Sequence, residues 1–288
     1  MKTILLLATI LIGVLFPFTH EYSFLIKYLL MIMLFFSFLK MEVKKSDLQK
    51  NHLYLLSINL LVPITFYLIF RSIGNLQLAQ VAFITAIAPT AIASPVIVNL
   101  LNGKIEFTVI SILLTNFVIA FLLPFAIPFI LNNNSAISSV DVLQPVAEIF
   151  LIPFFLSLVS KKYFPGISQI LVKWNKYVFY ILVLNINLGT AKASNYIKSE
   201  MSFSDPIIYQ IAIVSLVLCI LYFTIGKFIA PKNLKLEGSQ SLGQKNNGFT
   251  VWVALTFISP LAVLGPVFYI LFQNFYISWQ LHKGQKKT

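Results

Sequence analysis

Long hydrophobic segments alternate with short polar ones along nearly the whole chain. We predict ten membrane-spanning helices from this pattern. They comprise residues 3–18, 24–40, 52–70, 76–101, 105–131, 140–160, 177–193, 206–230, 236–257 and 260–281. The pattern predicts an all-α polytopic membrane protein with a single membrane domain over residues 1–288. We expect the first segment to be retained, because no small-residue cleavage site precedes Glu21.

Two of these segments contain helix-breaking or polar stretches. The fourth is broken at 89–95, where prolines stand at both ends, and the ninth at 236–248, which is rich in Gly, Ser, Gln and Asn. Each is the fourth segment of its half, if the halves are 1–131 and 140–281 with a polar linker starting at Asn132-Asn-Asn-Ser135. Five spans per half make the halves run in opposite directions. The pattern therefore predicts two inverted five-helix repeats, with a substrate site at the breaks.

Composition and charge agree with a membrane protein. Of the 288 residues, 58% are hydrophobic and 10% charged, and the net charge is +12. With ten spans, sixteen of the 21 Lys and Arg residues fall on one side, and four on the other: Lys27, Arg71, Lys192 and Lys198. The positive-inside rule then places both termini, including the basic tail 282–288, in the cytoplasm. This explains the charge better than a nucleic-acid partner does. The compact, loop-poor chain suggests a bacterial inner membrane.

The sequence contains no pattern typical of an enzyme or a metalloprotein. The three histidines and one cysteine have no metal-ligand spacing. No phosphate-binding loop, nucleophile elbow or acid–base constellation is present. We therefore expect no enzymatic activity, no metal and no cofactor.

The breaks contain residues that suit an anionic ligand. Ser94 followed by Pro95 predicts the start of a half-helix capped by the serine. Asn246 and Asn247 are candidate caps for a second half-helix that starts at Gly248. Half-helix N-termini present free N–H groups and a partial positive charge. We assign Ser94, Asn246, Asn247 and Gly248 to substrate binding, although both breaks could instead be kinks without a ligand.

Lys245 lies inside the second break, and a lysine at membrane depth is a functional hypothesis by default. It could instead reach the membrane surface or form an ion pair. The candidate acidic partners are Glu237, Glu106 and Glu148. A buried lysine can also release its proton, which would make Lys245 a proton-coupling group. In the seventh segment, Asn185 and Asn187 could line a cavity or make packing hydrogen bonds.

Four stretches resemble the bile acid:sodium symporter family. They are Ala88-Pro-Thr-Ala-Ile-Ala-Ser-Pro95, Leu101-Asn-Gly-Lys104, Gly243-Gln-Lys-Asn-Asn-Gly248 and Phe257-Ile-Ser-Pro-Leu-Ala-Val-Leu-Gly-Pro266. The resemblance implies a panel of spans one, two, six and seven. It also implies a core of spans three to five and eight to ten, in which the two broken helices cross. Members of the family carry organic anions or related small acids, usually with sodium.

The chain departs from this family at the sodium sites. The resemblance maps those positions onto Ser94, Pro95, Thr108, Ile112, Ser241 and Lys245. Proline replaces an asparagine at Pro95, Ile112 has no ligating atom, Ser241 replaces an acidic residue, and Lys245 replaces a glutamine. Hard cations need several oxygen ligands, and a nearby ammonium repels them. We expect the lysine charge to substitute for a bound cation, with Lys245, Ser241 and Thr108 as the coupling or charge-bearing group.

Together these features predict a secondary transporter of a small organic anion that works by alternating access. It would be sodium-independent, either proton-coupled or facilitative, and its partners would be the anion and the lipid bilayer. A sodium symporter with rearranged ligands and a non-transporting membrane sensor or scaffold are the alternatives. The oligomeric state stays open.

Overall fold

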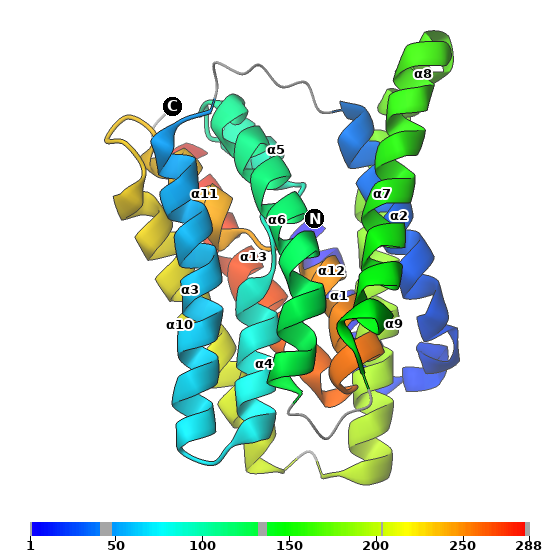
Figure 1. Ribbon diagram of the computed structural model, residues 1–288, viewed down its shortest axis with the longest axis vertical. Helices are drawn as coiled ribbons and strands as arrows, with labels where there is room; N and C mark the ends of the chain where they lie inside the picture. The colour runs from blue at the N-terminus through cyan, green and yellow to red at the C-terminus, as the bar shows by residue number, and fades with distance from the viewer. Residues whose placement is uncertain (1, 41–47, 132–136, 203, 286–288) are drawn as a thin grey trace.

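The computed structural model describes residues 2–40, 48–131, 137–202 and 204–285. Within these ranges every regular element is a helix (Figure 1), so the all-α prediction is confirmed. The elements are α1 (Lys2–Leu15), η1 (Pro17–Phe24), α2 (Leu25–Lys40), α3 (Lys50–Ser72), α4 (Leu76–Ile87), α5 (Ser94–Leu100), α6 (Ile105–Ile130), α7 (Ser139–Tyr163), α8 (Pro165–Trp174), η3 (Asn175–Tyr177), α9 (Val178–Glu200), α10 (Pro206–Ile229), α11 (Lys235–Gly243), α12 (Asn247–Val253), η4 (Ala254–Ile258), η5 (Leu261–Val263) and α13 (Leu264–Gln285). The predicted linker residues 132–135, Lys44 and Lys45, and residues 286–288 of the tail lie outside the described residues.

The chain is an integral membrane protein. Among the described residues, 6 helices are long and apolar enough to cross a bilayer. They are Pro17–Lys40, Lys50–Ser72, Ile105–Ile130, Ser139–Tyr163, Pro206–Ile229 and Leu261–Lys283. The other predicted segments correspond to α1, to α9, and to the interrupted pairs α4–α5 and α11–α12, which are shorter or more polar.

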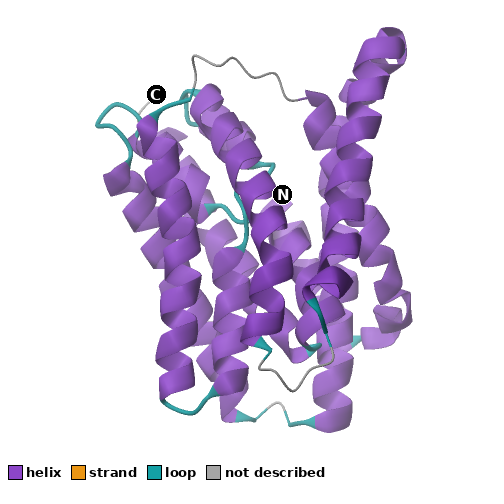
Figure 2. Ribbon diagram, viewed as in Figure 1, coloured by secondary structure: helices purple, strands orange, loops and turns teal. Residues whose placement is uncertain are grey.

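Helix is interrupted at both predicted breaks. The first interruption runs from Ile87 to Ser94. The second is much shorter than the predicted 236–248, because residues up to Gly243 form α11; it runs from Gly243 to Asn247, and Asn247 is the first residue of α12 rather than its cap. Ala88 adopts an extended backbone conformation, as the clash with a following proline requires. Figure 2 shows these loop segments at mid-height, among helices rather than at the ends of the bundle.

Two local predictions were wrong. Residues 161–176 lie between the predicted spans 140–160 and 177–193 and were therefore expected to form a loop, but α7 continues to Tyr163 and α8 follows almost directly. Pro165 stands at the first helical position of α8, where its missing N–H costs nothing. Ser94 is the first residue of α5 and not its cap, because Ala93 takes the cap position. The Ser94 N–H is already bound to the Ala91 carbonyl, 3.0 Å away.

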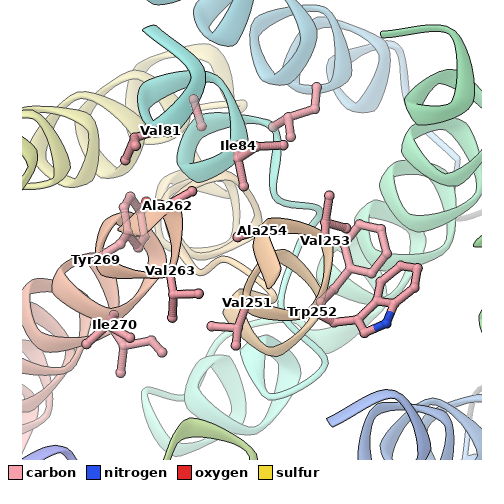
Figure 3. Close-up of a cluster of buried hydrophobic side chains, with 14 of the residues drawn as sticks. Val81, Ile84, Val251, Trp252, Val253, Ala254, Ala262, Val263, Tyr269 and Ile270 are labelled. Carbon is pink, nitrogen blue, oxygen red and sulfur yellow. The ribbon is translucent and has the colours of Figure 1, made fainter. Parts of the chain in front are cut away.

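The hydrophobic core surrounds α12, all of whose residues are buried. Figure 3 shows Ile84 of α4 on the side of Ala254, Val81 of α4 on the side of Ala262 and Tyr269, and Val263 of η5 beside Val251. Because apolar side chains enclose α12 from several elements, the polar residues just before it are held deep inside the bundle.

Several lysine-bearing segments gather at one end of the bundle. The turn between α5 and α6, helix α8, the turn between α10 and α11, and the end of α13 all lie at the top in Figure 1. These elements carry Lys104, Lys173, Lys232 and Lys283, so this part of the predicted cytoplasmic charge lies at one end of the bundle.

Candidate functional site

The two breaks meet in the middle of the protein. Thr90 and Lys245 face each other in an isolated antiparallel bridge. The Ala91 N–H donates to the Gln244 carbonyl, and the Asn246 N–H donates to the Pro89 carbonyl, both at 2.8 Å. Irregular backbone at membrane depth requires such internal partners, because lipid offers none. Pairing between the breaks therefore satisfies backbone groups that the interruptions leave without helical partners.

The two facing residues also cap each other's half-helices. The Thr90 hydroxyl donates to the Ser241 carbonyl near the end of α11, at 2.6 Å. The Lys245 ammonium donates to the Ala88 carbonyl just after α4, at 3.1 Å. The last carbonyls of a helix lack intrahelical partners and carry partial negative charge. One break thus supplies a hydroxyl for this role, and the other supplies a cation.

Neutral groups surround the Lys245 ammonium, and the residue is only 2% exposed. Besides the Ala88 carbonyl, Nζ donates to the side-chain oxygen of Asn59 on α3. It also lies 3.7 Å from the ring centroid of Tyr222 on α10, a cation–π contact. The Tyr222 hydroxyl donates to the Ala86 carbonyl at 2.9 Å, which fixes the ring against α4. The charge is therefore enclosed by two oxygens and an aromatic face.

None of the three acidic candidates bonds to Lys245 in the described part of the chain. Glu237 accepts the Lys104 N–H at 2.6 Å, at the turn between α5 and α6. Glu148 forms an ion pair with Lys27, at 2.6 Å, between α7 and α2. No interaction joins Glu106 to Lys245. The depth of Lys245 also rules out the surface-reaching alternative.

A first group of polar residues lies where α5, α6 and α11 contact one another. Ser94 Oγ, Ser241 Oγ and Asn116 Oδ1 are buried without a hydrogen-bond partner. Thr108 is buried, and its hydroxyl donates within α6 to the Ile105 carbonyl at 2.8 Å. Ile112 is buried and supplies no ligand.

The sodium ions that the resemblance implies do not fit these residues. A hard cation prefers several oxygen ligands, often including carboxylates. Around Ser94 and Ser241 the described residues place neutral oxygens, and the buried carboxylate of Glu237, one turn before Ser241 on α11, already accepts the Lys104 N–H. Around Asn59 and Ala88 the ammonium of Lys245 already uses the available oxygens. A sodium ion at the Asn59 and Ala88 oxygens would therefore have to displace the Lys245 ammonium.

A second polar group lies between α9 and α12. Its buried atoms without partners are Asn185 Oδ1, Asn246 Nδ2 and Asn247 Oδ1. A Cβ placed on Gly248 would lie 3.8 Å from the side-chain oxygens of both Asn185 and Asn246, so these amides converge on the glycine. Buried polar atoms in proteins are nearly always hydrogen-bonded, and several exceptions together need an explanation.

Asn246 caps α12 as predicted, since its side chain accepts the Phe249 N–H at 3.4 Å. This capping changes the expected chemistry of the break. The Phe249 and Thr250 N–H groups both bond to the Asn246 carbonyl or amide. The side-chain atoms left for a ligand belong to Ser94, Ser241, Asn246 and Asn247. At the start of α12 the N–H groups of Asn247, Phe249 and Thr250 are already bonded within the break.

Several residues of the site were not assigned from the sequence. Asn59 and Asn116 are amides within predicted spans, a signal that could have identified them. Gln273 of α13 accepts the Lys245 backbone N–H at 2.9 Å, and it too is an amide within a span. Tyr222 had no distinguishing signal, because tyrosines are common throughout this chain.

Comparison with protein-family models finds no match for this chain. Comparison with curated proteins finds no match either. The resemblance to the bile acid:sodium symporter family therefore rests on the residues quoted above, and it enters below as part of a proposal.

Proposed function

We propose that this protein is a secondary transporter of a small organic anion, with the ten-span, inverted-repeat plan of the bile acid:sodium symporter family. The observation that carries the proposal is the meeting of two interrupted helices around buried polar atoms without partners. Transporters of this kind bind substrate where discontinuous helices meet near the midplane. Both termini would be cytoplasmic, in a bacterial inner membrane.

In this proposal the substrate binds at Ser94, Asn246, Asn247 and Gly248. The hydroxyl of Ser94 and the amide NH₂ of Asn246 can donate to an anionic group, and both lack partners. The Asn247 oxygen can accept from a hydroxyl or amine on the same ligand. All four positions are buried, so a change of conformation has to open them to one side and then to the other.

Lys245 supplies the positive charge that sodium supplies in the family. Its ammonium donates to the side-chain oxygen of Asn59 and to the Ala88 carbonyl, and no carboxylate among the described residues pairs with it. Thr108 and Ser241 complete the altered cation-site group. Transport is then sodium-independent, and it is facilitative or, if Lys245 releases its proton during the cycle, proton-coupled.

A thermal-shift screen of the purified protein tests this function. Small carboxylates, sulfonates and steroid acids are added in sodium or choline buffer at two pH values. We expect an anion to raise the melting temperature in choline buffer, with no further effect of sodium. The shift should disappear in Lys245→Gln and persist in the control Lys173→Gln, which removes an exposed lysine on α8.

The alternatives give different results. Stabilisation of the unmodified protein only in sodium would contradict the lysine-for-cation proposal and favour a sodium symporter. Binding that Lys245→Gln leaves unchanged, with no uptake of the same anion into proteoliposomes, would favour a sensor or scaffold.

A further inference from the structure

A groove opens on the outer face of the protein, between α10 and α13. Its volume is about 330 Å³, at the lower end of the range of about 300–1,000 Å³ for ligand pockets. Its lining includes Ile220, Phe223, Thr224, Phe275, Tyr276 and Trp279. Both helices are long and apolar enough to span the membrane. Hydrocarbon is therefore the material in contact with the groove.

Two lysines stand at one end of this groove. Helices α10 and α13 run in the same direction (Figure 1), and each has a basic residue in its last turn, Lys227 and Lys283. Lys227 follows Thr224 by about one turn, and Lys283 follows Trp279 by about one turn. The Lys283 ammonium lies 5.2 Å from the Trp279 ring centroid, so it is directed back toward the groove.

We propose that this groove binds an anionic phospholipid, with one acyl chain in the groove and its phosphate between Lys227 and Lys283. The apolar lining matches the acyl chain, and the two exposed lysines match the negative headgroup. Trp279 stands one turn before the basic end of α13, and membrane proteins commonly place indoles at the boundary between hydrocarbon and headgroup. Basic positions between spanning helices are known to recognise anionic headgroups.

The floor of the groove is in direct contact with the second break. A Cβ on Gly243, the last residue of α11, would lie 2.3 Å from the Phe223 ring. Phe223 packs on Tyr276 with ring centroids 4.2 Å apart. Gln280 donates to the Tyr276 hydroxyl and accepts from Gln240 of α11. A lipid in the groove would therefore contact the same side chains that pack against α11. This contact does not depend on whether the protein transports a substrate.

Quenching of tryptophan fluorescence by brominated lipids tests the proposal without a transport assay. The fluorescence of Trp279 is measured in the variant Trp174→Phe, and the fluorescence of Trp174 is measured in Trp279→Phe. The two indoles are matched, at 55% and 56% exposed, while Trp252 is buried. We expect brominated phosphatidylglycerol to quench Trp279 at a lower mole fraction than brominated phosphatidylcholine does.

Removing the lysines should weaken this preference. An attraction of about 1 kcal/mol per lysine near a lipid headgroup corresponds to about five-fold in affinity for Lys227→Gln or Lys283→Gln and roughly 25-fold for the double variant. Quenching of Trp174 should not change in these variants. Equal quenching of Trp279 by the two lipids, or a preference that survives the double substitution, would overturn the proposal.

Filling the groove provides a second test. Thr224→Phe places a ring in the groove and should abolish selective quenching of Trp279, while Ile213→Phe, on another exposed part of α10, should not. Competition by inorganic phosphate would contradict a lipid and indicate a free-anion site. Cross-linking between α13 helices of two copies, with Trp279 protected from every lipid, would assign the groove to a second copy.

Discussion

Thr90 and Lys245 hold equivalent places in the two breaks, yet their side chains differ in charge. Each pairs with the other through the backbone bridge, and each caps a carbonyl of the opposite half-helix. A hydroxyl is sufficient to satisfy such a carbonyl. The ammonium of Lys245 therefore does more than capping requires, and the proposed role in balancing an anionic substrate accounts for the difference.

At Thr90, substitution by valine keeps the shape and removes the donor. The Ser241 carbonyl, just inside the end of α11, then loses its 2.6 Å hydrogen bond in a buried place. We expect Thr90→Val to lower the free energy of unfolding by about 1–2 kcal/mol, measured by denaturant titration in mild detergent. The control Thr65→Val removes a hydroxyl on an exposed face of α3 and should have little effect. Equal stability of the two variants would show that the cap contributes nothing.

The local part of the site was predictable, and the assembled part was not. Asn246 could be identified as a cap because an amide two residues before Gly248 ends a polar stretch and precedes an apolar one. The partners of Lys245 come from α3, α4 and α10. These partners come together only when the helices pack, and no residue spacing along the sequence predicts which helices will contact Lys245. Asn246 was therefore predicted, and the enclosure of Lys245 by Asn59 and Tyr222 was not.

At the scale of elements, α10 and α11 pack with almost no side chain between them. A Cβ placed on Gly238 would lie 2.4 Å from the Gly226 carbonyl oxygen and 2.3 Å from the Ala230 Cβ. Real Cβ atoms do not approach backbone so closely. The two glycines thus allow α11, a polar half-helix, to be covered by a long apolar one.

The variant Gly238→Ala should separate these two helices. Overpacking of a tight contact costs about 1–3 kcal/mol, and we expect a loss of that size in a thermal or denaturant unfolding experiment. Gly166→Ala is the matched control, because no atom lies within 4 Å of the added Cβ at the start of α8. A Gly238→Ala protein as stable as the control would mean that α11 can shift without cost.

Most elements could be predicted because hydrophobic length and proline positions are local signals. Pro89 and Pro95 mark the first break, and the structure has it between Ile87 and Ser94. Helix α8 was missed because lysines on both sides of it suggested a loop. Ile167, Ile170 and Trp174 in fact recur at helical spacing within it, and that signal could have been used.

For the whole molecule, the number of spans depends on whether each interrupted pair crosses the membrane. If α4 and α5 together cross, the turns before and after them face opposite sides. The chain has one cysteine, Cys219, which is buried. In a Cys219→Ser background we expect Ser72→Cys and Lys104→Cys to react with an impermeant maleimide from opposite sides. Labelling of both from the same side would contradict the ten-span topology.

The positive charge of Lys245 is covalently attached to the protein, and this affects how membrane voltage acts on the proposed transport cycle. A cation bonded to the chain returns with the carrier after each cycle, so its charge cancels over the cycle. If Lys245 keeps its proton, a monovalent anion is the only net charge moved, and about 2.3 kcal/mol per 100 mV drives it out of a negative interior. If the lysine carries one proton with each anion, the cycle is electroneutral. Membrane voltage would then drive export in the first case and have no influence on the equilibrium in the second.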